Sequence, residues 1–439
     1  MTTYKKYFSI IALLIATVGF TMAQSVNLAN FRAPDQSGIN VFETPKDFDT
    51  EFTGMKVRVG GNFTQQFQAL SHSNTAILDT AGLPTNALMH INPGFNLATA
   101  NLNVDVQLAD GIRLNMVTYL SSRHHTEAWV KGGYIQFDKL PFGIDAIDNI
   151  MEYVTIKVGH MEINYGDGHF RRSDNGNAIY NPFVGNYIMD AFNTEIGAEI
   201  YFQKDGFLVM GGATGGEISG NITAGSVKDE NGKVVSEGKV APTYLAKVGY
   251  DKNLNEDLRV RLTGSLYYTS KSNANHIFDG DRTGARYYSV MVADGAADNF
   301  RSGRFSPGFK SAVTAVMVNP FLKYKGLEFF GLYEYAKGGT AAEAEAGTLR
   351  EWSQLSGEVI YRFFKNENLF LGARYNTVME GGDVTNPQSI DRVQIGGGWF
   401  LTPNILLKGE YVNQNYTNMT GVYNDGNFNG IMIEAVVGF

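Results

Sequence analysis

The sequence contains no cysteine, few prolines (11) and few tryptophans (3), and it has no long apolar run beyond its first residues. Without cysteine, neither a disulfide framework nor a thiolate metal site can form, and a lipid anchor on cysteine is excluded. After residue 23 no stretch offers about 18 consecutive apolar residues, so a transmembrane helix is not expected. The formal net charge of -8 argues against nucleic acid as a partner, because a protein surface that binds the acidic phosphate backbone is basic.

Glycine and two aromatic residues are what the chain has in quantity, with 50 Gly, 29 Phe and 23 Tyr in 439 residues. The mean hydropathy is nevertheless slightly hydrophilic, at -0.17. A helical membrane protein does not have this composition. It fits a chain whose apolar residues occupy every second position of many strands.

The first residues have the pattern of a secretory signal peptide. Lys5 and Lys6 are basic, residues 10–20 are apolar, and residues 21–23 place small side chains before a cleavage site at Gln24. The apolar run is too short to span a membrane comfortably. We therefore expect residues 1–23 to direct export.

Period-two alternation recurs from about residue 55 to the last residue. In residues 56–67, one parity is apolar and the other is polar: Val57, Val59, Phe63 and Phe67 oppose Lys56, Arg58, Asn62, Thr64 and Gln66. The alternating blocks run to ten or fifteen residues, whereas strands of soluble proteins average five or six. Tilted membrane strands need about nine to eleven residues. The pattern favours an all-β, antiparallel transmembrane barrel over residues 55–439.

Sixteen strands are predicted, an even number as single-chain bacterial barrels require. They lie at approximately 55–70, 94–108, 111–121, 126–138, 151–165, 192–203, 206–217, 242–251, 257–270, 310–324, 326–337, 349–363, 368–379, 391–401, 404–416 and 427–439. Short and long connections alternate between them, as periplasmic turns and extracellular loops do in outer-membrane barrels. Two connections break this rule, because 122–125 is short and 139–150 is long.

Three further local features carry predictions. Residues 24–54 lack alternation and form either a periplasmic extension or a short plug in the lumen. The change of apolar parity after Gly159 suggests a β-bulge there, with Met161, Ile163 and Tyr165 facing outward. The charged segment 271–309 is expected to be a solvated loop over the barrel mouth.

The final strand adds a specific feature. Ile431, Ile433, Ala435, Val437 and Phe439 share one face, so an alternating strand closes on an aromatic residue. It resembles the C-terminal strand that the outer-membrane assembly machinery recognises in barrel proteins. Together with the signal peptide, it predicts the outer membrane of a Gram-negative bacterium, with lipid and lipopolysaccharide as surroundings.

The whole layout resembles the bacterial outer-membrane porins of the sixteen-stranded type, and loosely the phosphate-selective group. In such porins the third long loop, after strand five, folds into the lumen and narrows it. Residues 166–191 hold that position here, so the resemblance implies a constriction formed by Asp167, His169, Arg171, Arg172 and Asp174. The alternative is a loop on the extracellular rim with its charges solvated. The resemblance also implies a homotrimer.

The polar parity of the strands supplies a pore wall, because charges are costly on the lipid face. Its predicted members are Lys56, Arg58, Arg113, Lys157, Glu162, Arg259, Arg261, Arg374 and Arg392. Cations slightly outnumber acids on this parity, which suggests a moderate preference for anions. The other interpretation is that these charges pair with one another and brace the barrel.

The function predicted from the sequence is passive diffusion of small hydrophilic solutes or ions, with no enzymatic step, no cofactor and no metal. Two alternatives remain open. One is a channel for hydrophobic substrates with about fourteen strands and an N-terminal hatch. The other is a plugged barrel that acts as a structural or complex-forming outer-membrane protein.

Overall fold

The structure is a computed structural model that describes residues 28, 30–44, 46, 51–96, 98–121, 128–216, 227–228, 231–236, 240–280, 286–297, 299–382 and 384–439. The expected signal peptide, residues 1–23, lies outside these residues. Within them, no helix is long and apolar enough to cross a membrane.

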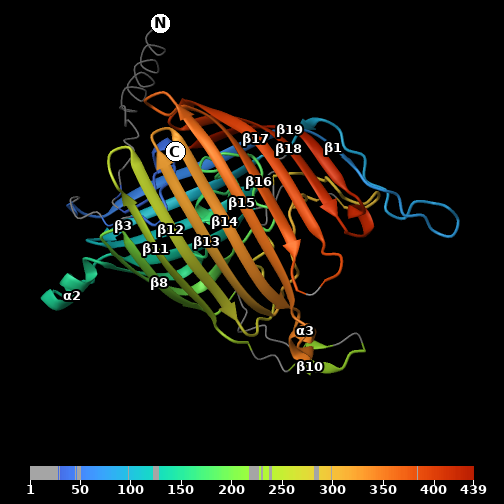
Figure 1. The fold of residues 1–439 in the computed structure, drawn as a ribbon. Helices are drawn as coiled ribbons and strands as arrows, with labels where there is room; N and C mark the ends of the chain where they lie inside the picture. The colour runs from blue at the N-terminus through green and yellow to red at the C-terminus, as the bar shows by residue number, and fades with distance from the viewer. Residues whose placement is uncertain are drawn as a thin grey trace, which may run out of the picture.

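Most of the described chain is β-strand, wound into one large sheet (Figure 1). The strands of this sheet are β1 (Lys56–Ser73), β2 (Gly94–Phe95), β3 (Thr99–Ala109), β4 (Ile112–Ser121), β5 (Ala128–Phe137), β6 (Val154–Glu162), β7 (Thr194–Lys204), β8 (Phe207–Thr214), β11 (Thr243–Asn253), β12 (Leu258–Thr269), β13 (Ala312–Tyr324), β14 (Leu327–Gly339), β15 (Arg350–Phe363), β16 (Leu369–Glu380), β17 (Ser389–Thr402), β18 (Ile405–Thr417) and β19 (Asn427–Gly438).

The sheet closes on itself because β1 pairs with β19 on one side and with β3 on the other. The two-residue β2 pairs with β1 beyond the end of β3, so β2 and β3 share one position around the barrel. Every pairing is antiparallel between neighbours in the chain, apart from this closure. The described residues therefore form a closed barrel with sixteen strand positions, which confirms the predicted fold.

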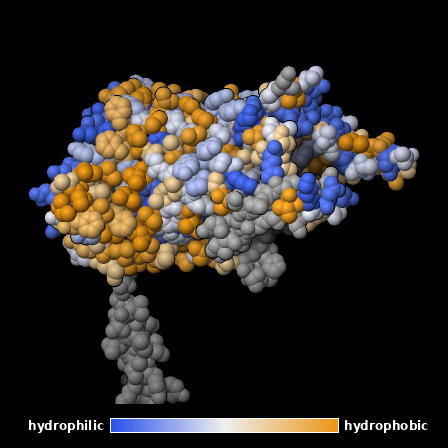
Figure 2. Space-filling view, turned by 90° about the horizontal axis from the view of Figure 1, so that it is seen from below, coloured by the Kyte–Doolittle hydropathy of each residue, from blue (hydrophilic) through white to orange (hydrophobic). Residues whose placement is uncertain are grey.

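The alternation of the sequence becomes an alternation of faces, as β18 illustrates. Leu406, Lys408 and Glu410 point inward and are buried, whereas Leu407 and Tyr411 point outward and are 43% and 46% exposed. Large apolar side chains are exposed in the same way on the other strands, and they cover broad areas of the outer surface (Figure 2). Such a surface is stable in lipid but not in water.

The connections also follow the predicted alternation. Tight turns join strands at the end where β1 begins and β19 stops, which is the periplasmic end in a porin layout. Between β7 and β8, for example, Asp205 and Gly206 have φ of 53° and 92°, the left-handed pair of a two-residue hairpin. The long connections at the other end carry β9 (Val227–Lys228), β10 (Val234–Ser236) and α3 (Ala341–Ala346). The exceptional periplasmic connection between β5 and β6 contains α2 (Asp145–Met151).

The bulge predicted at Gly159 is wrong. The pairing of β6 with β5 and β7 runs through this glycine without a shift of register. Met161, Ile163 and Tyr165 face inward, with exposures of 1–3%. The apolar residues change parity at the point where the chain turns from the wall into the lumen. From there on, the inward side chains pack in the core of the barrel, so they are apolar. The irregularity of this region lies in β5 instead, where the pairing with β4 shifts near Lys131.

The core of the molecule lies inside the barrel. Residues 163–193, between β6 and β7, are almost entirely buried there, packed on inward side chains of the opposite wall. Parts of the connection between β12 and β13 join them, since Ile277, Phe278, Tyr287 and Val290 are at most 3% exposed. The expectation of a wholly solvated loop at 271–309 is therefore wrong, because its apolar residues fill the lumen.

Candidate functional site

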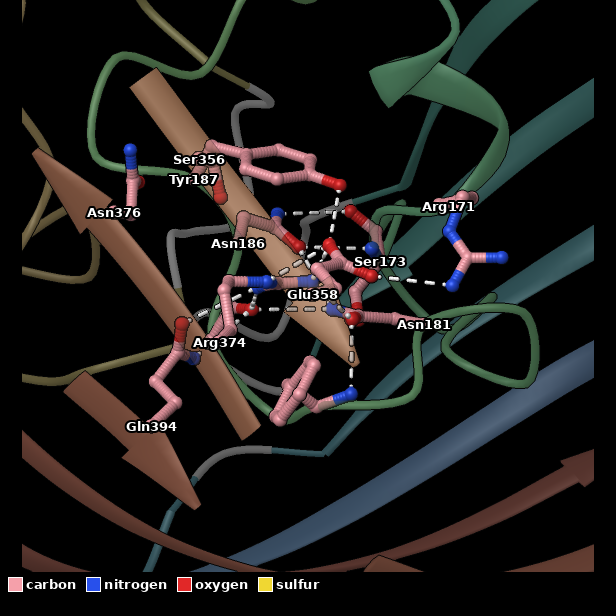
Figure 3. A network of polar contacts seen from close by, with 12 residues as sticks. Arg171, Ser173, Asn181, Asn186, Tyr187, Ser356, Glu358, Arg374, Asn376 and Gln394 are labelled. Carbon is pink, nitrogen blue, oxygen red and sulfur yellow. Dashed lines mark hydrogen bonds and ion pairs between the residues drawn. The ribbon is translucent and has the colours of Figure 1, made fainter. Parts of the chain in front are cut away.

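The segment between β6 and β7, residues 163–193, which we call the inner loop, is fixed to the wall by polar contacts rather than by apolar packing alone (Figure 3). Arg374 of β16 pairs with Glu358 of β15 at 2.8 Å and donates to the carbonyl oxygen of Gly185 at 2.9 Å. The Tyr187 hydroxyl donates to the same Glu358 carboxylate at 2.7 Å. Asn376 accepts from the backbone N–H of Ile188 at 2.8 Å. The wall thus holds the loop through its backbone as well as its side chains.

A quartet of buried charges fixes the start of the inner loop. Asp167 lies 2.7 Å from Lys247 and 2.8 Å from Arg261, and Glu43 lies 2.8 Å and 2.6 Å from the same two cations. Burial alone would raise the pKa of both acids, but the charges of Lys247 and Arg261 outweigh it. The pKa of Glu43 falls to about 2 and that of Asp167 falls well below its usual range. Both carboxylates are ionised at neutral pH, so the quartet is electrically balanced.

Arg171 makes a second buried ionic contact on the same side of the lumen. Its guanidinium lies 2.8 Å from Glu328 and 3.1 Å from Glu358, and it donates to the side-chain oxygen of Asn40. Burial would lower the pKa of Arg171, but the two carboxylates raise it further above its ordinary value. Arg171 is therefore a permanently charged bridge between the inner loop, the wall and the N-terminal segment.

That N-terminal segment crosses the periplasmic mouth, and we call residues 30–44 and Lys46 the strap. At one side, Gln36 donates from its backbone to the Pro403 carbonyl at 2.9 Å and from its side chain to the Asn366 carbonyl at 2.8 Å. At the other side, Lys46 donates to the carbonyls of the β5–β6 connection, including Asp138 at 2.8 Å. These anchors lie on opposite sides of the ring of strands. The strap therefore spans the opening.

A cavity of about 300 Å³ remains between the inner loop, the strap and the wall formed by β1 and β3–β7. Its lining follows β6 from Thr155, next to the periplasmic end of that strand, to Glu162 at the other end. Polar side chains dominate this wall, where neutral carboxamides such as those of Asn103 and Asn115 lie between charged side chains. The lumen is thus filled on one side and polar and hollow on the other.

The extracellular part of the cavity is lined by a linked set of ionisable groups. Lys131 lies 2.7 Å from Glu162 and also contacts Asp174. His169 hydrogen-bonds Glu162 at 2.7 Å and Asn164 at 3.0 Å. Burial lowers the pKa of the His169 imidazole, and the hydrogen bond and charge of Glu162 offset only part of this effect. The imidazole is therefore neutral at pH 7 and orients Glu162 without adding charge.

Two cations of the cavity stand out because their contacts with carboxylates are longer than those of the other cations in the lining. Lys157 lies 3.9 Å from Glu199, with its amine near the rings of Tyr134 and Tyr201. Arg32 of the strap stacks 3.5 Å above a tyrosine ring and donates only to carbonyl oxygens. Burial lowers the pKa of Arg32 to about 10, so the group stays charged at neutral pH. These two side chains give the cavity excess positive charge.

Most of the residues predicted from the sequence either line the cavity or lie buried on the filled side of the lumen. The cavity brings together His169, Arg172 and Asp174 of the inner loop with Arg58, Arg113, Lys157 and Glu162 of the wall. On the filled side, Asp167 and Arg171 are buried in ion pairs, as are Arg261 and Arg374, while Arg392 donates to loop carbonyls. Arg259 pairs with Asp251 at 2.6 Å, and Lys56 is half-buried at the start of β1 outside the lining.

Sequence reasoning missed the strap residues of the site and the residues that hold the inner loop. Arg32 and Glu43 lie in a segment without periodicity, so no pattern assigned them a partner. Tyr187 was equally hidden, although an apolar run at 187–189 inside an otherwise polar connection is a signal for burial. Lys131 was missed as well, because it shares its parity with the apolar Trp129 and Ile135 and reaches the lumen at the register shift of β5.

His169, Asp167 and Ser173 are side chains of the inner loop with chemistry that catalysis could use, and each of them contacts a different partner. His169 contacts Glu162 and Asn164, Asp167 holds Arg261, and Ser173 accepts a hydrogen bond from Asn181 at 3.1 Å. Across the described residues there is no group of three or more His, Asp or Glu side chains placed to hold a metal ion.

Comparison with known proteins bears on the fold. No protein-family model matches the chain, and no curated protein matches its sequence. Among solved structures, the anion-selective porin from Comamonas acidovorans is 11% identical, with a TM-score of 0.50 over 88% of this chain and 100% of that chain. OprB from Pseudomonas putida is 10% identical, with a TM-score of 0.50 over 87% of this chain and 94% of that chain. With its lipid-facing surface and its closed ring of sixteen strand positions, the chain has the fold of the porins of Gram-negative outer membranes.

Proposed function

We propose that the protein is an outer-membrane porin through which small hydrophilic solutes diffuse passively along the cavity beside β6. The observation that carries the proposal is that cavity. It follows the length of β6, and its lining is polar and charged. In this proposal His169, Arg172 and Asp174 form the constriction opposite Arg58, Arg113, Lys157 and Glu162. No chemical step is needed.

The charges of the lining support a preference for anions. Six cations line the cavity against four carboxylates: Arg32, Arg58, Arg113, Lys131, Lys157 and Arg172 against Glu43, Asp105, Glu162 and Asp174. In a narrow aqueous space such an excess attracts anions and repels cations by Coulomb interaction. The preference is moderate, because most of these cations are paired: Arg58 and Lys131 with acids of the lining, and Arg113 and Arg172 with Asp138 and Asp190 just outside it.

A second candidate function is favoured by the filling of the lumen. The inner loop, the strap and the buried part of the β12–β13 connection occupy most of the interior, as a plugged barrel of a larger complex would require. The hydrophobic-substrate channel has less support, since the barrel has sixteen strand positions and its lumen is charged. The only feature of such a channel that the described structure has is an N-terminal segment placed across the barrel opening, the strap.

Single-channel recording of the refolded protein in a planar bilayer, with a KCl gradient, tests the proposal. The porin gives stable steps and a reversal potential of anion sign. A bulky substitution in the cavity wall, Asn115→Trp, should reduce the step size, whereas Leu371→Trp on the lipid face should leave it unchanged. Absence of conductance from protein shown to be folded and inserted would refute the porin and support the plugged barrel.

A further inference from the structure

The long periplasmic connection between β5 and β6 carries apolar side chains that nothing in the described structure covers. Phe142 is 61% exposed, Ile144 is 51% exposed and Ile150 is 59% exposed. Three large apolar side chains within nine residues are costly to leave in water. The other periplasmic turns are short, and those with an exposed large apolar side chain carry a single one, such as Phe364 between β15 and β16 and Leu254 between β11 and β12.

The helix of this connection, α2, is amphipathic. Asp145, Asp148 and Asn149 lie on one side, whereas Ile147, Ile150 and Met151 lie on the other, at the spacing of an α-helix. Met151 is buried against the barrel at 3% exposure, so the apolar side of α2 begins on the wall and continues outward. The acidic side faces away from it.

The apolar side of α2 is continuous with the lipid-facing surface of the barrel. Tyr153, two residues after α2, packs on Phe202 of β7 at 6.1 Å, and Lys204 lies over the same tyrosine ring. Nearby, Phe207 of β8 is 60% exposed and packs on Tyr250. Aromatic side chains at this level form the girdle where a barrel meets the lipid headgroups. α2 projects sideways from the rim at this level, beyond the wall (Figure 1).

From this placement we propose that residues 140–151 are a membrane foot, whose side chains at Phe142, Ile144 and Ile150 insert into the periplasmic leaflet around the barrel. Lipid is the occupant because it already covers the surface from which the foot extends. An amphipathic segment of this kind lies in the plane of the interface, with its apolar side about 5–10 Å deep. The acids Asp145 and Asp148 then face the periplasm, where they remain hydrated.

The absence of native cysteine allows a direct test by single-cysteine labelling of the full chain. Phe142→Cys and Ile150→Cys carry an environment-sensitive fluorophore, and each variant is refolded into phospholipid vesicles. Three labelled controls share the preparation: Asp148→Cys on the polar side of α2, Glu256→Cys on another periplasmic turn and Ile395→Cys on the lipid face, midway along β17. Heat-modifiable electrophoretic mobility shows that each variant is folded.

The foot predicts that nitroxide lipids labelled near the headgroup quench positions 142 and 150 at least about twofold more than positions 148 and 256. Nitroxides at the acyl-chain end should quench Ile395→Cys more than Phe142→Cys or Ile150→Cys, because position 395 lies at the middle of a strand. Aqueous iodide should quench positions 148 and 256 more than positions 142 and 150. Equal iodide quenching at 142, 150 and 256, without lipid quenching, would overturn the proposal. So would protection from both quenchers, which would instead indicate cover by a second copy of the chain.

Discussion

Replacement of Glu43 by glutamine is the sharpest test of how the strap is held in the lumen. Glu43 contributes one of the two negative charges of a balanced quartet, at 2.8 Å from Lys247 and 2.6 Å from Arg261. Asp167 supplies the other negative charge. Glu43→Gln therefore leaves Lys247 with Asp167 alone and Arg261 with Asp167 and the partly exposed Asp251, and it removes the two ion pairs that Glu43 makes with the wall.

The size of the effect follows from the burial of the quartet. All four side chains are at most 5% exposed, so water cannot replace the lost carboxylate without movement of the strap. Removal of one partner from a buried ion pair costs roughly 3–5 kcal/mol. Because Asp167 still holds both cations, we expect the lower end, about 3 kcal/mol. A cost of that size shifts an equilibrium between docked and released strap by about a hundredfold.

Single-channel recording measures the result. With the strap released, the periplasmic opening widens, so Glu43→Gln should raise the conductance and the current noise and should move the reversal potential further towards anion selectivity. Glu51→Gln is the matched control, since it makes the same charge change at an exposed residue of the N-terminal region. A folded Glu43→Gln protein with the step size and selectivity of the control would refute the idea that the quartet keeps the strap in place.

Three other predictions follow from the same structure. The pKa of Glu43 lies at about 2 in the folded protein against an ordinary value of 4.5, so its ionised form stabilises the docked strap at neutral pH. This stabilisation is lost as the pH falls from about 4.5 towards 2, and conductance should rise reversibly over that range in acid titrations of the wild type but not of Glu43→Gln. Lys157→Gln should move the reversal potential towards cations, whereas Lys252→Gln at the exposed end of β11 should not; equal values would show that Lys157 does not face the ion path. Gly185→Ala should lower thermal stability by about 1–3 kcal/mol, because its Cβ would meet the Tyr287 hydroxyl; an unchanged midpoint in heat-modifiability gels would contradict this packing.

The wall of the barrel could be predicted from the sequence because the forces that orient each strand residue act between that residue and its immediate surroundings. In a strand with lipid on one side and a polar lumen on the other, apolar and polar residues must alternate. The polarity of each residue therefore indicates which side it faces. Pairs such as Arg374 with Glu358, which face each other across β15 and β16, also follow once the hairpin register is known. Such a pair needs only two neighbouring strands and the tight turn between them.

The filling of the lumen could not be predicted in this way. Ile163, Tyr165 and Tyr287 are apolar residues in connections, and the sequence does not say which wall they contact. The parity change after Gly159 was a real signal, but it marked an inward turn of the chain rather than a bulge. Contacts such as Asn40 with Glu328 join residues 288 positions apart, so they depend on the final arrangement of several segments.

The position of the cavity has an explanation in the partners of the wall charges. On β1 and β3–β7, cations contact acids of the wall, as Arg58 contacts Asp105 at 2.7 Å, and Lys131 also contacts Asp174 of the inner loop. On the opposite wall, Arg374 and Lys408 pair with the wall acids Glu358 and Glu434, but each cation has further N–H donors. Lys408 donates to the carbonyls of Ala178, Asn181 and Phe183, and Arg374 donates to that of Gly185. Because a buried donor without an acceptor is costly, these cations hold the loop backbone against their own side of the barrel. The space for solutes therefore remains on the other side of the lumen, beside β6.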